Sequence, residues 1–552
     1  MGEIIEFKRD HGYFFKKGTE AIAVGKFFDA VKNVRKAIEL CDNLFLKSSY
    51  YLVLAQAYSK LNLIQISNRC YFKALDFDSF SQIAFLGLGE NFYLAKDYVM
   101  AQYYLNLCVR TGNEGPVIEK ANLILKEINK SGKSFRVIKT DQEELNDKYL
   151  NIAEKYMLKG NFDKAIENFL LVDEKILDEK QKNQLRSGLS FAYFFTGNTD
   201  KGIELSESVD NKTTLDLCNL LLLYYYNEET EKLESVKTEI LSKEDLSKED
   251  LYKIAISFAH IKDHKVAKEY AQKVLQDNSF AIEIEHLYAI ACINCGEKDT
   301  AKAKLLTLLT LDPENAYIYK KYLNMCDKQN LKELDYVFGL QYGEYVRVGR
   351  TINNWLEADV DLLDKLATEN VDFLYYIVKH ITGKARNLLL LKLCDIDRPA
   401  LSSFFEDVLL DPAVSKTQKV QIMTRRISNY SLIKQNYVID DYYNRIALPS
   451  TSMMKIKNPN LFLAVILASE FLMDKFLGGN LNLKTEVFAV LKALEKNDLD
   501  FNKYILAGII VWLFVREKRW CELRVVCAHF AITEKDLMDA LEKLKIDSNL
   551  MV

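Results

Sequence analysis

Proline and glycine are scarce in this sequence of 552 residues, which contains 6 Pro and 21 Gly. Average usage would give about 28 Pro and about 39 Gly in a chain of this length. Because these two residues are the strongest breakers of regular structure, a chain that avoids both is typical of many helices joined by short turns. Apolar residues make up 49% and charged residues 28%, a globular balance that excludes wholesale disorder.

Charge of one sign and long apolar runs are also missing. The 74 basic and 78 acidic residues give a net charge of 74 − 78 = −4, which offers no general attraction to nucleic acid or an anionic membrane. The richest apolar stretch, residues 504–515, is about 12 residues long and predicts a buried helix, because it is too short to span a bilayer. Residues 1–8 lack the basic and apolar regions of a secretory signal. We therefore expect a cytoplasmic protein with no membrane contact.

Patterns that carry catalytic or metal chemistry are lacking as well. The ten cysteines are scattered through apolar patterns, which favours buried thiols in a reducing compartment over a disulfide framework. Cys292-x2-Cys295 is a lone pair, whereas a zinc site needs two further ligands at compatible spacing. Gly87 and Gly89 fit close helix packing better than a dinucleotide loop, and no nucleophile signature is present. We expect a protein that is not an enzyme, with no cofactor, no metal and no small-molecule substrate.

A repeated pattern of small and aromatic residues runs through residues 14–313. One clear copy reads Tyr51-x2-Leu54-Ala55-x2-Tyr58. Equivalent copies begin near residues 14 and 85 and, in a second block, near 149, 189, 251 and 288, with a blurred copy over about 214–243. The small residues that open the second half of the unit lie 37 and 34 residues apart in the first block (Ala30, Ser67, Ala101) and 34 apart in the last two copies (Ala267, Ala301).

This pattern resembles the tetratricopeptide repeat, which reads W-x2-L-G-x2-Y, then A-x3-F and Pro, with a period of 34 residues. The resemblance covers roughly residues 12–113 and 146–313, with seven copies in phase. The chain departs from the family pattern at Lys17, where Leu is expected, and in the closing Pro, which appears only at Pro313. The resemblance implies an all-α fold, in which antiparallel helix pairs stack into a right-handed superhelical solenoid.

Each class of repeated residue has a structural role in such a helix pair. Small residues let the two helices approach closely, aromatic residues one turn later fill the gap to the next helix, and glycines end the first helix. The small residues are Gly18, Ala55, Gly89, Ala153, Ala255 and Ala289, the aromatic residues are Tyr58, Phe92, Tyr156, Tyr193 and Phe258, and the turn glycines are Gly25, Gly160, Gly197 and Gly296.

The helical pattern continues after the repeats but loses the 34-residue period. Apolar residues at i, i+3 and i+4 predict helices over residues 331–355 and 373–380, in the manner of HEAT-like pairs. A basic cluster (Lys416, Lys419, Arg425 and Arg426) is typical of a solvated face. We expect four regions: residues 1–131 as a first repeat block with a capping helix, 142–330 as a second block, 331–450 as irregular helical repeats and 460–552 as a compact helical domain. A linker is expected near 131–141 and a loop over 449–459.

The end of the chain resembles a helix-turn-helix unit and, with the helix before it, the last helices of a cyclin-type repeat. Ala531 stands where Gly usually makes the turn, Thr533 is the expected N-cap, and Asp536 follows three residues later. DNA readers carry basic or amide side chains at the start of the second helix. The carboxylates of Glu534 and Asp536 favour a structural or protein-contacting helix pair instead, so we expect no nucleic acid partner.

In the solenoid that the resemblance implies, the first helices line a concave wall. Some family members hold a C-terminal carboxylate there with Lys, Asn and Arg, but the corresponding residues of the first block are apolar, so that site is absent. The inward positions assigned from the repeat phase are Phe15, Leu52, Leu86, Leu150, Phe191, Phe194, Tyr252, Ile256, His286, Ile290 and Ile293.

Two kinds of occupant fit an apolar wall of this kind. One is a partner's amphipathic helix or apolar peptide, and the other is the chain's own later helices or a second copy of the chain. The main hypothesis is a non-catalytic protein–protein interaction scaffold or adaptor. The alternative is a peptide-sensing regulator whose C-terminal unit contacts nucleic acid. The composition, rich in Lys, Ile and Asn, is consistent with a bacterial protein.

Overall fold

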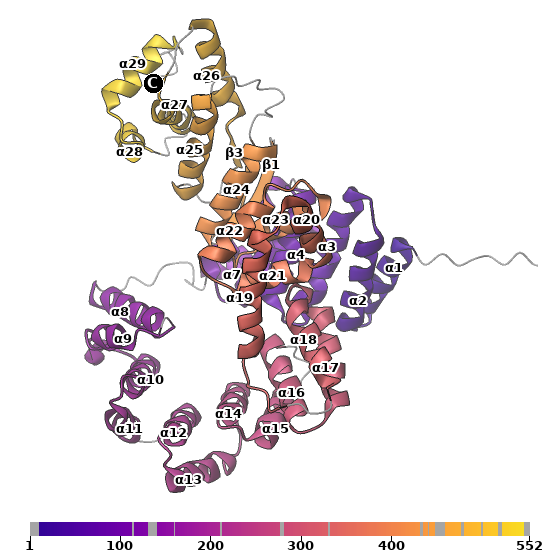
Figure 1. Ribbon diagram of the computed structural model, residues 1–552, viewed down its shortest axis with the longest axis vertical. Helices are drawn as coiled ribbons and strands as arrows, with labels where there is room; N and C mark the ends of the chain where they lie inside the picture. Colours follow the sequence, from indigo (N-terminus) through magenta and orange to yellow (C-terminus); the bar gives the residue numbers. More distant parts are fainter. Residues whose placement is uncertain are drawn as a thin grey trace, which may run out of the picture.

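Two blocks of antiparallel helix pairs open the chain (Figure 1). The computed structural model describes residues 10–112, 115–130, 141–158, 160–209, 212–276, 281–328, 332–430, 434–439, 441–447, 459–475, 480–497, 501–516 and 521–545. The linker expected near 131–141 and the loop expected over 449–459 fall almost entirely outside these ranges. The first block contains α1 (His11–Ala23), α2 (Phe27–Leu40), α3 (Leu44–Lys60), α4 (Ile64–Phe77), α5 (Gln82–Leu94), α6 (Tyr98–Thr111) and α7 (Pro116–Lys130).

The second block continues the same arrangement, and the blurred copy over 214–243 forms an ordinary helix pair, α12 and α13. The block ends in a short 3-10 turn, η2 (Pro313–Asn315), followed by one more helix, α18 (Ala316–Cys326). Its elements are α8 (Asp141–Leu158), α9 (Phe162–Phe169), η1 (Glu174–Ile176), α10 (Glu179–Phe195), α11 (Thr199–Glu207), α12 (Thr214–Tyr226), α13 (Thr230–Leu241), α14 (Lys248–His260), α15 (His264–Leu275), α16 (Ile282–Asn294) and α17 (Lys298–Leu311).

A residue with positive φ follows the first helix in each of these pairs. At the predicted turn glycines (Gly25, Gly160, Gly197 and Gly296) φ lies between 68° and 86°. The remaining pairs place a residue with a side chain at the same point (Asn62, Lys96, Glu228 and Lys262), with φ between 60° and 63°. This conformation costs a non-glycine residue roughly 1–2 kcal/mol. The packing of the helix pair therefore fixes the turn whether or not glycine is present.

The small residues allow the close helix approach that the sequence predicts. A Cβ atom added at Gly18 would lie 2.4 Å from the Cγ2 atom of Val34 on the second helix. A Cβ atom at Gly89 would lie 2.6 Å from the Cγ atom of Leu105. Ala55 and Ala153 occupy the same position in other pairs and are fully buried. Larger side chains at these points would push the two helices apart.

The C-terminal half is helical, with two departures from the sequence predictions. The helix predicted over 331–355 begins only at Tyr342, and the described residues before it, 332–341, form neither helix nor strand. Val337 N donates to Asp335 O at 3.0 Å in a tight turn. Three short strands also occur, in the order β1-β2-β3, with β1 and β2 antiparallel and β2 and β3 parallel. The elements are α19 (Tyr342–Glu357), α20 (Val360–Glu369), α21 (Val371–His380), α22 (Lys384–Leu393), α23 (Pro399–Leu410), α24 (Lys416–Tyr430), β1 (Lys434–Ile439), β2 (Tyr442–Ala447) and β3 (Asn480–Asn482).

The basic cluster on α24 is not a uniformly solvated face, so that interpretation was wrong in part. Lys419 is fully buried and its Nζ donates to the backbone oxygen of Val438 in β1. Arg426 is also buried, and its Nη2 donates to Ser402 Oγ at 2.8 Å. Arg425 forms a two-bond ion pair with Asp395 at the surface. Two of the four cations therefore hold α24 against its neighbours.

The last helices form a compact unit at one end of the molecule (Figure 1). They are α25 (Pro459–Lys475), α26 (Lys484–Asn497), α27 (Lys503–Arg516), α28 (Leu523–His529) and α29 (Glu534–Lys543). The predicted turn is confirmed: Ala531 has φ of 52°, and Thr533 and Asp536 form a reciprocal capping box. Among the described residues, no helix is both long enough and apolar enough to cross a membrane.

The chain folds back so that its first block contacts its C-terminal half. Helix α2 contacts α17, and α4 contacts α23. Figure 1 shows the second block as an arc, from α8 through α12 to α16, that leads back to this contact. The molecule is thus an all-α solenoid of helix pairs whose two ends are brought together.

Candidate functional site

The inner wall of the arc is formed by the first helices of the second block. Figure 1 shows α10, α12 and α14 on the inner side of the arc, with α11, α13 and α15 on the outer side. The predicted wall residues of this block fall into two groups by exposure. Phe191, Phe194, Tyr252 and Ile256 are half-buried, whereas Leu150, His286, Ile290 and Ile293 are buried.

The chain's own irregular segment, residues 332–341, lies on one end of this wall. The side-chain amide of Asn294 holds the backbone of Leu334 twice: Asn294 Nδ2 donates to Leu334 O, and Leu334 N donates to Asn294 Oδ1, both at 2.9 Å. The Nε2 atom of His286 lies 3.1 Å from the backbone oxygen of Val337. These three bonds use the main chain of the segment, as recognition of an extended peptide does.

An apolar cavity of about 180 Å³ remains beneath this segment. The wall contributes Tyr252, Ile256, His286 and Ile290, and the segment contributes Tyr336, Val337 and Phe338. The ring of Phe338 meets the ring of His286 edge to face at 5.2 Å. The structure therefore brings four of the predicted wall residues together around one small cavity.

Burial keeps His286 in its neutral form. Removal from water lowers the pKa of His286 to about 4, because the charged imidazolium loses its hydration. A carbonyl oxygen only accepts hydrogen bonds, so the neutral ring carries its proton on Nε2 and donates to Val337 O. The Nδ1 atom is buried without a hydrogen-bond partner.

The C-terminal ends of α10 and α12, next to this part of the wall, carry a cluster of aromatic rings. Phe194 contacts Phe195 edge to face at 5.5 Å, and its ring lies 6.0 Å from that of Tyr226. Tyr226 in turn meets Tyr225 at 5.4 Å. Phe195 is 52% exposed and Tyr226 is 49% exposed. Large apolar rings gathered at this exposure are typical of a contact surface.

Sequence reasoning missed several wall residues that the structure reveals. Phe195, Tyr226, His260 and Asn294 each lie two positions before the turn residue of their helix pair. These positions could have been predicted by counting back two residues from the turn position of each repeat, because the turn glycines were already aligned. No sequence pattern indicated that the segment at 334–338 is not helical, because the spacing of its apolar residues is compatible with a helix.

The predicted residues of the first block lie apart from this wall. Phe15 is half-buried and stacks on the ring of Tyr50 at 4.2 Å. Leu52 is half-buried, and Leu86 is 8% exposed. These side chains pack between successive first helices of their own block.

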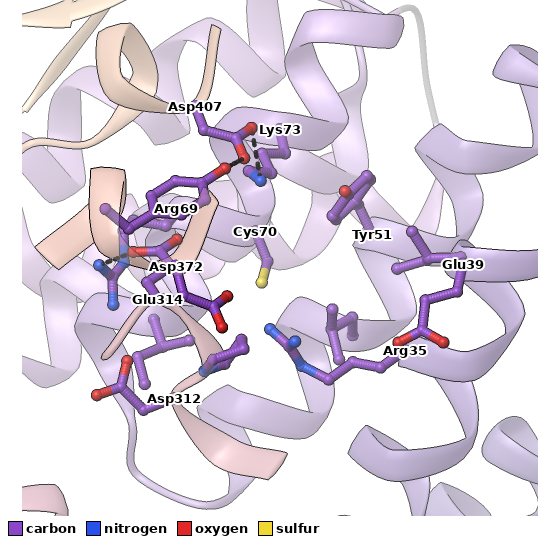
Figure 2. A pocket seen from close by; sticks show the side chains of 15 residues that line it. Arg35, Glu39, Tyr51, Arg69, Cys70, Lys73, Asp312, Glu314, Asp372 and Asp407 are labelled. Atoms are coloured by element: carbon purple, nitrogen blue, oxygen red, sulfur yellow. Dashed lines mark hydrogen bonds and ion pairs between the residues drawn. The ribbon is translucent and has the colours of Figure 1, made fainter. Parts of the chain in front are cut away.

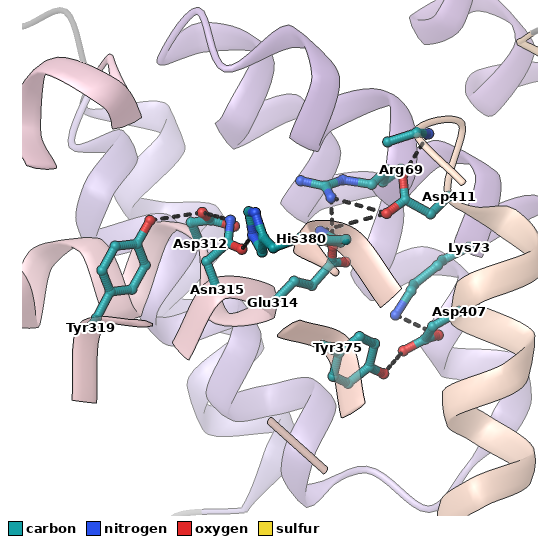
Figure 3. A network of polar contacts seen from close by, with 12 residues as sticks. Arg69, Lys73, Asp312, Glu314, Asn315, Tyr319, Tyr375, His380, Asp407 and Asp411 are labelled. Atoms are coloured by element: carbon teal, nitrogen blue, oxygen red, sulfur yellow. Dashed lines mark hydrogen bonds and ion pairs between the residues drawn. The ribbon is translucent and has the colours of Figure 1, made fainter. Parts of the chain in front are cut away.

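A partly buried polar network joins the first block to the C-terminal half (Figure 3). Arg69 on α4 contacts Glu314 at 2.5 Å and Asp411 at 3.4 Å, and Lys379 on α21 contacts the same two carboxylates. Burial alone would raise the pKa of Glu314, but the charges of Arg69 and Lys379 hold it well below its usual value. Glu314 is therefore charged, and these ion pairs join the two ends of the arc.

The β1–β2 hairpin makes a second contact with the first block. The hydroxyl of Tyr104 donates to the backbone oxygen of Asp441 at 2.5 Å and accepts from Tyr443 N at 2.9 Å. The Tyr443 hydroxyl donates to Leu75 O at 2.9 Å. These bonds hold the hairpin against α4 and α6. The strands therefore help to join the C-terminal half to the first block.

The thiol pair that a zinc site would use is part of the core. Cys292 is fully buried, and burial raises its pKa to about 11. Cys295 is partly exposed. No group of three or more His, Cys, Asp or Glu suited to a metal ion occurs among the described residues.

Comparison with known proteins returns similar helical structures only. No family model and no curated protein matches the chain. Similar solved structures include a tetratricopeptide repeat protein from Parabacteroides merdae (12% identity, 58% of this chain, 99% of that chain, TM-score 0.21). Another is the P58(IPK) TPR domain (13% identity, 76% of this chain, 97% of that chain, TM-score 0.22). A third is the APC/C hetero-tetramer Cut9–Hcn1 (11% identity, 97% of this chain, 96% of that chain, TM-score 0.21).

These TM-scores are too low to support any argument about function. The fold assignment rests on the chain itself, through its small-residue helix contacts, its positive-φ turns and its succession of antiparallel pairs. The protein is an all-α solenoid built from antiparallel helix pairs.

Proposed function

We propose that the protein is a non-catalytic interaction scaffold, whose second-block wall binds an apolar peptide segment of a protein partner. The observation that carries this proposal is the segment at 334–338. It lies on the wall as a bound peptide would, with its backbone bonded to Asn294 and His286 and its side chains over Tyr252 and Ile256.

The partner segment follows the same wall toward α10. The rings of Phe194, Phe195 and Tyr226 continue the apolar surface beyond the chain's own segment. Bonds to a peptide backbone give affinity without fixing sequence, whereas ring contacts select apolar side chains. The preferred partner therefore carries aromatic or aliphatic residues.

A pre-organised wall suits this function because the helix pairs hold its rings in place before binding. Little conformational entropy is then lost by the scaffold, and most of the ordering cost falls on the partner segment. Self-association would use the same wall if the segment came from a second copy of the chain.

Site-specific photo-crosslinking tests the proposal. A benzophenone amino acid replaces Phe195 or Tyr226 on the wall and, as a matched control, Leu241 on the outer helix α13, which is 45% exposed. We expect crosslinks to one partner polypeptide from the two wall positions and none from position 241. Crosslinks from the outer position alone, or equal crosslinks from all three, would contradict a role for the wall.

A further inference from the structure

A cavity lies between the first block and the C-terminal half, at the closure of the arc (Figure 2). Its volume of about 280 Å³ is the space of about nine water molecules. Helices α2, α3 and α4 form one wall, and η2, α21 and α23 form the other. This cavity is separate from the concave wall of the second block, so its role is independent of the proposed function.

Arg35 borders the cavity without an acidic partner. Its Nε donates to the hydroxyl of Tyr58 at 2.9 Å. Within the described part of the chain, no carboxylate lies within ion-pair distance of its guanidinium. Figure 2 shows the guanidinium pointing toward the middle of the cavity, beside the thiol of Cys70. The N–H groups of its two terminal nitrogens can therefore donate hydrogen bonds to a ligand.

The other basic residues of the cavity lining are already paired. Arg69 contacts Glu314, and Lys73 contacts Asp407 at 2.6 Å. Lys73 also lies 5.6 Å from the centre of the Tyr51 ring. Arg35 is therefore the one cation of this lining that has no acidic partner among the described residues.

The space next to Arg35 is partly apolar. Ile38, Leu54 and Ile66 line it, and the ring of Tyr51 forms a further side. When a ligand contacts Arg35, the rest of the ligand therefore contacts apolar side chains. Small-molecule sites commonly combine a few polar groups that orient the ligand with an apolar lining.

Acidic side chains in the walls disfavour an occupant with more than one negative charge. Asp312, Glu314, Asp372 and Asp407 all line the cavity. The charges of Arg69 and Lys379 hold the pKa of Glu314 well below its usual value. A dianion beside these carboxylates would be repelled more strongly than a monoanion in a medium of low dielectric constant. A planar carboxylate also matches the fork of a guanidinium.

We propose that this cavity binds a small organic monocarboxylate. The carboxylate accepts hydrogen bonds from the terminal nitrogens of Arg35, and the apolar body contacts Ile38, Leu54 and Tyr51. These contacts come from α2 and α3, the wall of the cavity that belongs to the first block.

Isothermal titration of the full chain with benzoate tests this proposal, with neutral benzamide and inorganic phosphate as comparison ligands. We expect saturable binding of benzoate and much weaker binding of the other two. Arg35→Met should weaken benzoate binding by roughly tenfold to a hundredfold, the usual worth of hydrogen bonds to a charged group. The matched control is Arg350→Met, an exposed arginine on α19, which should bind as the wild type does.

Three results would overturn the assignment: no binding of benzoate, equal binding of benzamide, or tighter binding of phosphate. A photoaffinity experiment on the wild-type chain covers the case in which Arg35→Met fails to fold. A diazirine-bearing benzoate should label α2, α3 or α4 (residues 27–77), and excess benzoate should suppress the labelling. Labelling confined to other helices, or labelling that benzoate does not suppress, would also overturn it.

Discussion

Single residues at the helix-pair turns show how the repeat controls its backbone. Lys96 and Gly197 occupy the same point in two pairs, with φ of 63° and 86°. Lys96 is exposed, and nothing lies within 4 Å of a Cβ atom added at Gly197, so substitutions there report backbone strain alone. We expect Lys96→Gly to raise the free energy of unfolding by about 1 kcal/mol and Gly197→Ala to lower it by about 1 kcal/mol. Thermal unfolding of both variants checks this, and shifts of the same sign would contradict it.

The buried imidazole of His286 makes stability depend on pH. Its pKa is about 4 in the folded chain and about 6.5 in an unfolded chain. Above pH 6.5 both states are neutral, and as pH falls toward 4 the unfolded state binds the proton first, so stability is lost. The loss between pH 7 and pH 5 is about 2 kcal/mol.

The variant His286→Gln isolates this contribution from other titrating groups. We expect the free energy of unfolding of the variant to fall less than that of the wild type between pH 7 and pH 5, in urea titrations at both values. The exposed His260→Gln on α14 is the matched control and should keep most of the wild-type slope. Identical slopes for wild type and His286→Gln would show that the buried ring does not titrate as described.

At the scale of elements, one side chain holds the backbone of Leu334, at the start of the segment 334–338. Asn294 accounts for both bonds to Leu334, so Asn294→Ala should release that end of the segment. We expect amide hydrogen exchange at Leu334 to become at least about tenfold faster, since each lost bond is worth about 1 kcal/mol. Asn227→Ala, at the end of α12, is the control and should leave exchange at Leu334 unchanged. Unchanged exchange in Asn294→Ala would mean that ring contacts alone hold the segment.

The helix pairs could be predicted from sequence because their signals are local. Within one 34-residue unit, small residues such as Ala55 and Gly89 predict close helix contacts, and a glycine such as Gly197 predicts the turn. The segment at 334–338 could not be predicted in this way, because a helix would also fit the spacing of Leu334, Val337 and Phe338. Their burial comes from α14 and α16, and only the folded chain supplies that contact.

At the scale of the whole molecule, closure of the arc depends on charges far apart in sequence. Arg69 and Glu314 are 245 residues apart, and no periodic pattern connects them, which is why the sequence predicted the solenoid but not its closure. The cavity beside Arg35 escaped prediction for the same reason.

Removing Arg69 should open the molecule. Arg69→Met leaves Glu314 and Asp411 with Lys379 as their remaining cation, and breaking a buried pair costs roughly 3–5 kcal/mol, which is the upper bound for this partly exposed pair. We expect a larger radius of gyration in small-angle scattering. Lys36→Met, which removes a surface pair with Glu39, is the control and should change nothing. A radius of gyration unchanged in Arg69→Met would show that the hairpin contacts suffice for closure.

The most direct measurement of peptide binding by the second-block wall uses the chain's own segment as the probe. A fluorescent peptide with the sequence of residues 332–341 is titrated into the double variant Tyr336→Ser, Phe338→Ser, whose own segment has lost its ring contacts. The account predicts saturable binding, measured by anisotropy, that is lost when Asn294→Ala is added and weak in the wild type, where the wall is occupied. Binding that is equal with and without Asn294, or absent from every variant, would contradict it.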